Sequence, residues 1–160
     1  MRVTHTAWFN CSPHHLWTFI EDPEKQKLWM KGLVDNQSTS PPPVRPGSTF
    51  HLRIKEGRYI NDYDGEIVAR EAPNFLSIRF WGGSFSPGMI MSVDYRLSEE
   101  NGGTRLDYES RVEGKRPGFF LWLLLSTIVR LFGKMHLKSF LKRLKELAEA
   151  PSEPTPAQAG

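Results

Sequence analysis

Residues 89–113 have the sequence MIMSVDYRLSEENGGTRLDYESRVE, in which apolar and polar side chains alternate on both sides of a central Asn101-Gly102-Gly103. Alternation with period two predicts a strand with one buried and one solvated face. An Asn-Gly pair favours the tight turn of a β-hairpin, because that turn needs positive φ. We therefore predict antiparallel strands over 89–98 and 104–113, in a sheet that something must cover on one side.

The same signals continue toward the N-terminus and predict five more strands. Alternation predicts strands over 48–56, 58–70 and 75–82, and β-branched and aromatic residues predict two more over 2–9 and 33–39. In strand 58–70 we expect the covered side to hold Tyr59, Asn61, Tyr63, Gly65, Ile67 and Ala69, and the solvated side to hold Asp62, Asp64, Glu66 and Arg70. The proline-rich segment 40–47 predicts an extended connecting loop.

Three helices are expected around this sheet. Ser12-Pro13 and Asp22-Pro23 each predict a helix start, because the Ser or Asp oxygen can cap free amides and proline suits the first helical position. Pro117 opens a long C-terminal helix, since apolar residues then recur at helical spacing. The stripe expected to face the sheet consists of Trp122, Ser126, Val129, Gly133, Leu137, Phe140, Leu141, Leu144 and Leu147.

Ser126 and Gly133 are small residues in the middle of this stripe. Small side chains opposite a curved sheet leave volume unfilled, and an empty apolar cavity costs roughly 24 cal/mol per Å³. Two alternatives remain open at this point. A ligand fills the volume, or neighbouring Trp and Phe side chains turn in and fill it.

A second apolar stripe covers only the first half of the helix, and it consists of Phe120, Leu124, Ile128, Leu131 and Met135. The same side then becomes basic, with Lys138, Lys142 and Lys145. Its cover is the chain's own loops or short helices, a second copy in a homodimer, or an anionic membrane surface. The apolar run 119–129 is shorter than the ~20 residues needed to span a bilayer.

The composition limits the remaining classes of protein. The 160 residues carry a net charge of +3, and we expect one domain over 1–150 followed by a polar, disordered tail over 151–160. The single cysteine, Cys11, excludes an internal disulfide and a multi-cysteine zinc site. With no secretory signal, a cytoplasmic location is expected, with peripheral membrane contact as an option. No motif indicates a cofactor, a metal or a nucleic-acid partner.

Several short motifs follow this order of elements. They are Phe9-Asn10-Cys11-Ser12-Pro13, Pro46-Gly47-Ser48, Tyr63-Asp64-Gly65-Glu66 and Leu141-Lys142-Arg143-Leu144. Together, over residues 2–149, they resemble the START-like, or SRPBCC, superfamily, and most closely its polyketide cyclase/dehydrase and lipid-transport branch. The resemblance implies an α+β helix-grip fold. In that fold a curved antiparallel sheet of about seven strands wraps around a long C-terminal helix, with two short helices after the first strand.

The resemblance also implies a cavity between sheet and helix that binds a lipid, an isoprenoid or a polyketide-like molecule. The first hypothesis is a non-catalytic carrier or sensor. The second is a polyketide cyclase or dehydratase of the aromatase type that uses His5 and Tyr108, and the third is a protein-interaction module. The candidate ligand-binding residues are Phe50, Leu52, Tyr63, Ile67, Ile78, Phe80, Met91, Val93, Tyr95, Leu106, Tyr108, Trp122, Ser126, Val129, Gly133 and Leu137.

Overall fold

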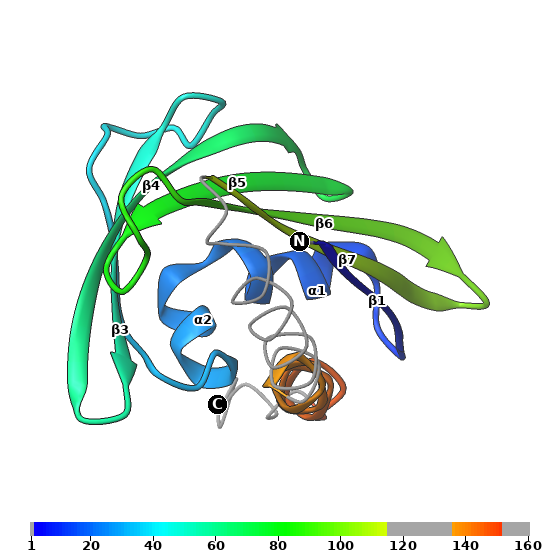
Figure 1. The fold of residues 1–160 in the computed structure, drawn as a ribbon. Helices are drawn as coiled ribbons and strands as arrows, with labels where there is room; N and C mark the ends of the chain where they lie inside the picture. Colours follow the sequence, from blue (N-terminus) through cyan, green and yellow to red (C-terminus); the bar gives the residue numbers. More distant parts are fainter. Residues whose placement is uncertain (1, 115–135, 152–160) are drawn as a thin grey trace, which may run out of the picture.

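A computed structural model describes residues 2–114 and 136–151, which form a curved sheet wrapped around helices (Figure 1). The elements are β1 (Arg2–Phe9), α1 (Pro13–Glu21), α2 (Pro23–Trp29), β2 (Leu33–Ser38), β3 (Thr49–Glu56), β4 (Tyr59–Glu71), β5 (Phe75–Gly82), β6 (Ile90–Glu100) and β7 (Gly103–Glu113). Residues 136–148 are helical. The strands pair antiparallel in the order β1-β7-β6-β5-β4-β3-β2. Both short helices and the C-terminal helical residues lie on the concave side (Figure 1).

The strands, helix starts and turn that local signals predict are confirmed. Each predicted strand lies within two residues of its observed bounds. The Ser12 hydroxyl accepts a hydrogen bond from the His15 amide at 3.2 Å, and the Asp22 carboxylate accepts one from the Glu24 amide at 2.9 Å. Asn101 has φ of 50° in the β6–β7 turn. The α+β helix-grip architecture expected from the sequence is therefore correct.

One expectation about faces is wrong, because β4 contains a bulge. Ile67 pairs with Ile78, but the next pair is Ala69 with Ser77, so Val68 is an extra residue. An extra residue reverses the alternation beyond it. Arg70, predicted on the solvated side, therefore pairs with Leu76 and meets α1, where its Nη2 donates to Glu21 Oε2 at 3.1 Å. Ala69, predicted on the covered side, moves to the other face.

The core lies where the C-terminal helix meets β1, β7 and α1. Its most deeply buried members include Phe9, Leu16, Leu106 and Leu144, each with no exposed area. Helix residues Leu137, Leu141 and Ala148 join the same cluster. The end of the helix is tied to the start of the chain, because the Asn10 amide donates to Glu149 Oε1 at 2.7 Å. The His15 Nε2 lies 3.0 Å from the Ala148 carbonyl oxygen.

The outer face of the sheet is built from charged and polar pairs. Asp94 on β6 is only 4% exposed, and its carboxylate accepts hydrogen bonds from Ser77 at 2.6 Å and Arg111 at 3.2 Å. Further along this face, the His51 ring lies between two carboxylates, with Nδ1 2.9 Å from Asp64 and Nε2 3.1 Å from Asp62. Hydrogen bonds to Asp64 and then Asp62 raise the pKa of His51.

Replacing Leu144 with Ala should lower the free energy of unfolding by about 2–5 kcal/mol, because the substitution leaves a cavity at a fully buried site. Urea denaturation monitored by circular dichroism measures the change. The exposed Lys142 on the same helix offers a matched control, and Lys142→Ala should stay within about 0.5 kcal/mol of the parent protein. Equal effects of the two variants would contradict the proposed position of the helix.

The His51 ring should make stability depend on pH. A raised folded-state pKa stabilises the fold fully below the unfolded value of 6.5, and this contribution is lost as pH rises through the folded value. The stability difference between parent and His51→Gln should therefore be larger at about pH 5.5 than at about pH 8.5. Chemical denaturation at both pH values measures it, with the exposed His14→Gln as control. A difference that does not change with pH would show that the carboxylates do not hold the ring.

Candidate functional site

The concave face of the sheet has a closed part and an open part. Near α1 the inward Phe9 and Leu106 side chains have no exposed area. Toward the middle of the sheet, Ile67, Ile78 and Met91 also contact the core, yet they remain only half-buried. Apolar side chains on an inward face usually become covered. These half-buried side chains make this part of the face the candidate site.

A row of polar side chains crosses the concave face beside this open part. His5 on β1 pairs with Tyr108 on β7, and Tyr108 pairs with Tyr95 on β6. The two tyrosine rings meet edge to face at 5.4 Å between centroids. Burial raises the pKa of both tyrosines, and a hydrogen bond with Ser110 opposes this for Tyr108. Both side chains are therefore neutral phenols at physiological pH.

A second apolar cluster occupies the β3–β4 side of the concave face. Leu33, Leu52 and Tyr63 are its buried members. The Tyr63 hydroxyl donates to Glu56 Oε1 at 2.8 Å and lies 2.9 Å from the Ser84 hydroxyl. Gly83 has φ of +55°, and a Cβ there would lie 2.3 Å from the Tyr63 ring. The loop after β5 therefore folds directly onto Tyr63, at a position where only glycine fits.

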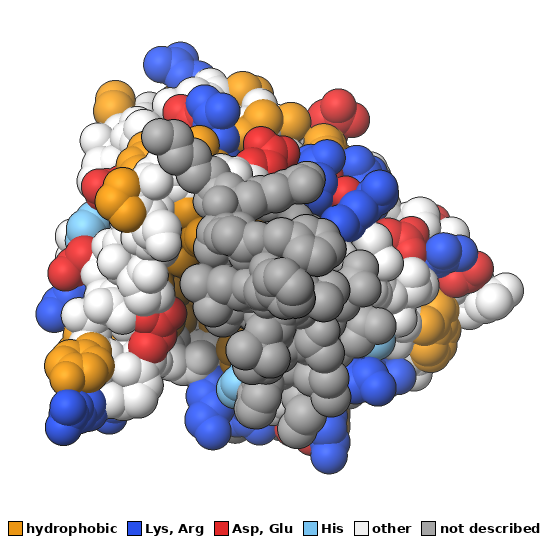
Figure 2. All heavy atoms as spheres, viewed as in Figure 1, with side chains coloured by type: hydrophobic (Ala, Val, Ile, Leu, Met, Phe, Trp, Pro, Cys, Tyr) orange, Lys and Arg blue, Asp and Glu red, His pale blue; other side chains and the backbone are white. Residues whose placement is uncertain are grey.

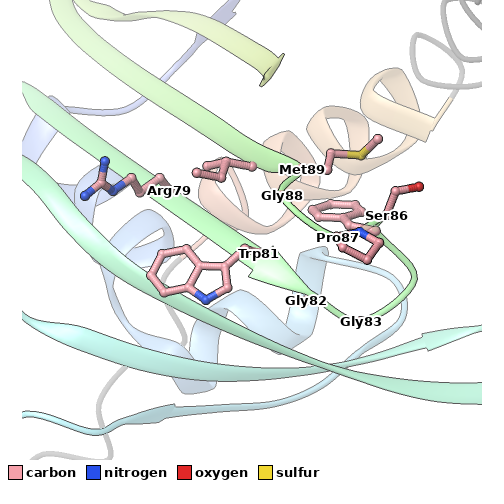
Figure 3. A pocket seen from close by; sticks show the side chains of 10 residues that line it. Arg79, Trp81, Gly82, Gly83, Ser86, Pro87, Gly88 and Met89 are labelled. Carbon is pink, nitrogen blue, oxygen red and sulfur yellow. The ribbon is translucent and has the colours of Figure 1, made fainter. Parts of the chain in front are cut away.

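This loop also forms one wall of a groove of about 650 Å³. Figure 3 shows Arg79 and Trp81 on β5, with Ser86, Pro87 and Met89 in the loop beyond it. Phe85 lines the groove and also stacks on Phe80, with centroids 5.8 Å apart. Because Phe80 belongs to the concave face, Phe85 connects the groove with that face.

The candidate ligand-binding residues that fall within the described chain all join these two clusters. They are Phe50, Leu52, Tyr63, Ile67, Ile78, Phe80, Met91, Val93, Tyr95, Leu106, Tyr108 and Leu137. Leu52, Tyr63, Val93, Tyr95, Leu106 and Leu137 are buried, and the other six are half-buried. Trp122, Ser126, Val129 and Gly133 lie outside the described residues, as do Phe120, Leu124, Ile128, Leu131 and Met135 of the second stripe.

Other inward positions differ from the sequence expectation. Tyr59 was expected on the covered side but is 60% exposed at the start of β4. Asn61 donates to the Glu56 carboxylate at the edge of the concave face. Sequence reasoning missed Phe85, since it lies in a glycine-rich loop with no periodicity. The apolar character of this loop residue was the one available signal.

Cys11 is the single cysteine of the chain. Burial, and to a lesser degree Glu149, raises the pKa of its thiol, which makes it a poor nucleophile. Within residues 2–114 and 136–151, no three His, Cys, Asp or Glu side chains come close enough together to hold a metal ion. No helix in that part of the chain has the length and apolar character needed to cross a membrane.

The apolar side chains visible on the surface in Figure 2 are separated by charged groups rather than gathered in one patch. Exposed large apolar residues, counted over the described chain, are Trp8, Leu28, Val34, Val44, Tyr59, Ile60, Val68 and Trp81. Their scatter over β1, α2, β2, β4, β5 and the 40–47 loop offers no broad docking surface on the described residues. The concave face is therefore the candidate site.

Solved structures with this architecture come from several bacteria. TTHA0849 of Thermus thermophilus superposes with a TM-score of 0.74 at 18% identity, covering 96% of this chain and 100% of that one. SA2116 of Staphylococcus aureus, titled a protein of unknown function, gives a TM-score of 0.72 at 11% identity and covers 93% of each chain. MLL2253 of Mesorhizobium loti gives a TM-score of 0.69 at 20% identity, and the match covers 96% of this chain and 100% of that one. These likenesses show the fold.

Comparison of the sequence with family models identifies the family. A search of curated protein sequences finds no significant match. The family model described as polyketide cyclase / dehydrase and lipid transport matches residues 1–149, which is nearly the whole chain. That match agrees with the curved sheet, the concave apolar face and the C-terminal helix. The chain therefore belongs to the polyketide cyclase / dehydrase and lipid transport family, and its helix-grip fold is one that binds hydrophobic ligands.

Proposed function

We propose that this protein binds a small hydrophobic molecule, such as a lipid, an isoprenoid or a polyketide-like compound, between the concave face and the C-terminal helix. It acts as a carrier or sensor and does not transform the ligand. The observation that carries the proposal is the partial exposure of Ile67, Ile78, Phe80 and Met91, which pair with one another across β4, β5 and β6 beside the buried core. A ligand lying there would bury apolar area at roughly 25 cal/mol per Å².

The groove beside the β5–β6 loop supports the same proposal. Its volume of about 650 Å³ lies within the roughly 300–1,000 Å³ typical of small-molecule sites. Its lining is mostly apolar, with Trp81, Met89 and Ile90 among its members. Because Phe85 contacts both the groove and the concave cluster, a displacement of this one side chain would join the two spaces. The groove is thus the proposed route to the concave face.

The alternative function, a cyclase-type enzyme, has one observation in its favour. His5 and Tyr108 stand directly opposite each other on β1 and β7, as an acid–base pair on one substrate would. However, the hydrogen bond at the Tyr108 side chain is made with Ser110. A general acid or base needs its partner within hydrogen-bond reach. The described geometry therefore favours binding over catalysis.

Replacing Met91 with Trp should weaken binding of the neutral apolar dye Nile red by about tenfold, because the larger ring fills the space proposed for the ligand. Fluorescence titration measures the affinity, and the melting temperature checks the fold. Val68 is exposed at the β4 bulge, so Val68→Trp adds the same ring on a surface away from the concave side. This control should bind the dye as the parent protein does.

Mass spectrometry of freshly purified protein provides a second test. A denatured sample of the parent should release an apolar molecule, and the Met91→Trp variant should release less of it. No dye binding and no released molecule in the parent would refute the proposed function. Equal losses in Met91→Trp and Val68→Trp would move the site away from the concave face.

A further inference from the structure

The turn between β3 and β4 forms an exposed tip that carries two large apolar side chains. Residues 55–60 are all exposed, and among them Tyr59 is 60% and Ile60 46% exposed. A Cβ added to Gly57, at the turn itself, would meet no described atom within 4 Å. The turn lies at the lower left of Figure 1, where Figure 2 shows hydrophobic side chains beside basic ones. Two neighbouring large apolar residues on such a tip are a candidate contact point.

The two apolar side chains lie on opposite faces of the hairpin. Tyr59 pairs with Glu56 and Ile60 pairs with Lys55, and successive residues of a strand point to opposite sides. A protein partner with a flat surface would cover only one of these faces. The headgroup layer of a bilayer, in contrast, surrounds an inserted tip and accepts apolar groups from both sides. Tyrosine suits this layer, because its ring is apolar and its hydroxyl is polar.

Positive charge surrounds the apolar pair. Lys55 and Arg58 are exposed, and neither forms an ion pair with a described residue. The Arg58 guanidinium lies 5.0 Å from the centre of the Tyr59 ring. The Lys55 amide donates a hydrogen bond to the Gly32 carbonyl oxygen at 2.7 Å, which brings Lys31 to the base of the tip. Lys31 is also exposed and has no ion-pair partner among the described residues.

The neighbouring carboxylates already have protein partners. Glu56 Oε1 accepts a hydrogen bond from Tyr63 at 2.8 Å, and its Oε2 accepts one from Asn61. Asp62, farther along β4, lies 3.1 Å from the His51 ring. Unpaired positive charge therefore exceeds unpaired negative charge at the tip, and this excess favours an anionic partner.

The tip lies at the same end of the sheet as the groove. Tyr63 connects the two, because its hydroxyl meets Glu56 at the hairpin and Ser84 in the loop after β5. The β6–β7 turn at Asn101 lies at the other end of the sheet. A surface that contacts the tip would therefore lie close to the proposed route to the concave face.

We propose that the tip of the β3–β4 hairpin docks on an anionic lipid bilayer. Tyr59 and Ile60 enter the headgroup layer, while Lys31, Lys55 and Arg58 lie against the lipid phosphates. Each of these cations contributes about fivefold to the affinity. The contact is narrow, unlike the broad area that a stable protein–protein interface buries. The inference concerns a surface outside the concave face and does not depend on which ligand that face binds.

Co-sedimentation of the full chain with vesicles tests the inference. Vesicles of equal parts phosphatidylcholine and phosphatidylglycerol should bind the protein about a hundredfold more tightly than phosphatidylcholine alone, and added salt should weaken this binding. Lys55→Gln/Arg58→Gln should reduce affinity for the anionic vesicles about thirtyfold. Tyr59→Ser/Ile60→Ser should reduce it about tenfold, because apolar area no longer enters the headgroup layer. The melting temperature checks that each variant folds.

Lys138→Gln/Lys142→Gln is the matched control, because it removes two exposed cations from the C-terminal helix and changes the net charge equally. It should bind anionic vesicles as the parent does. No binding by the parent, or equal losses in the two charge variants, would overturn the docking inference. A dimer in light scattering that Tyr59→Ser/Ile60→Ser dissociates would also overturn it, by assigning the tip to a second copy. Nile red binding without vesicles does not involve the tip, so it tests the proposed function separately.

Discussion

The structure depends on covering the single apolar face of a strongly curved sheet. The helical residues 136–148 supply part of that cover, and the end of this helix is attached to Asn10, between β1 and α1, and to His15 in α1. Burial of Leu144 there supplies the free energy, and the hydrogen bonds set the position. Two segments more than 130 residues apart along the chain thus hold the sheet and the helix together.

The packing is unequal along the concave face. Close to the attached end, Phe9, Leu16 and Leu106 have no exposed area. Further away, Ile78 and Met91 contact the core but stay half-buried. Because protein interiors are otherwise packed to crystal-like density, this difference is the feature on which the proposed ligand site rests.

Charged side chains are also distributed unequally between the two faces of the sheet. Polar groups on the outer face form pairs, as Asp94 does with Arg111, and this leaves the opposite face free for apolar and neutral groups. The one guanidinium seen to turn inward in the described chain, that of Arg70, meets Glu21 of α1. The Tyr95 and Tyr108 phenols on the concave face carry no charge, because burial raises their pKa.

Local signals in the sequence were sufficient to predict the helices and strands described here and to place most of the candidate-site residues on the concave face. Ser12-Pro13, Asp22-Pro23 and Asn101-Gly102 predict caps and a turn, because each acts on backbone groups within a few residues. Alternation assigned Tyr95 and Tyr108 to the concave face for the same reason. Tertiary pairing decided the rest. The bulge at Val68, which turns Arg70 inward, arises from the pairing between β4 and β5. The hydrogen bond between the Tyr63 and Ser84 hydroxyls forms only because the loop after β5 folds back onto the sheet. Such contacts join residues distant in sequence, so no local pattern encodes them.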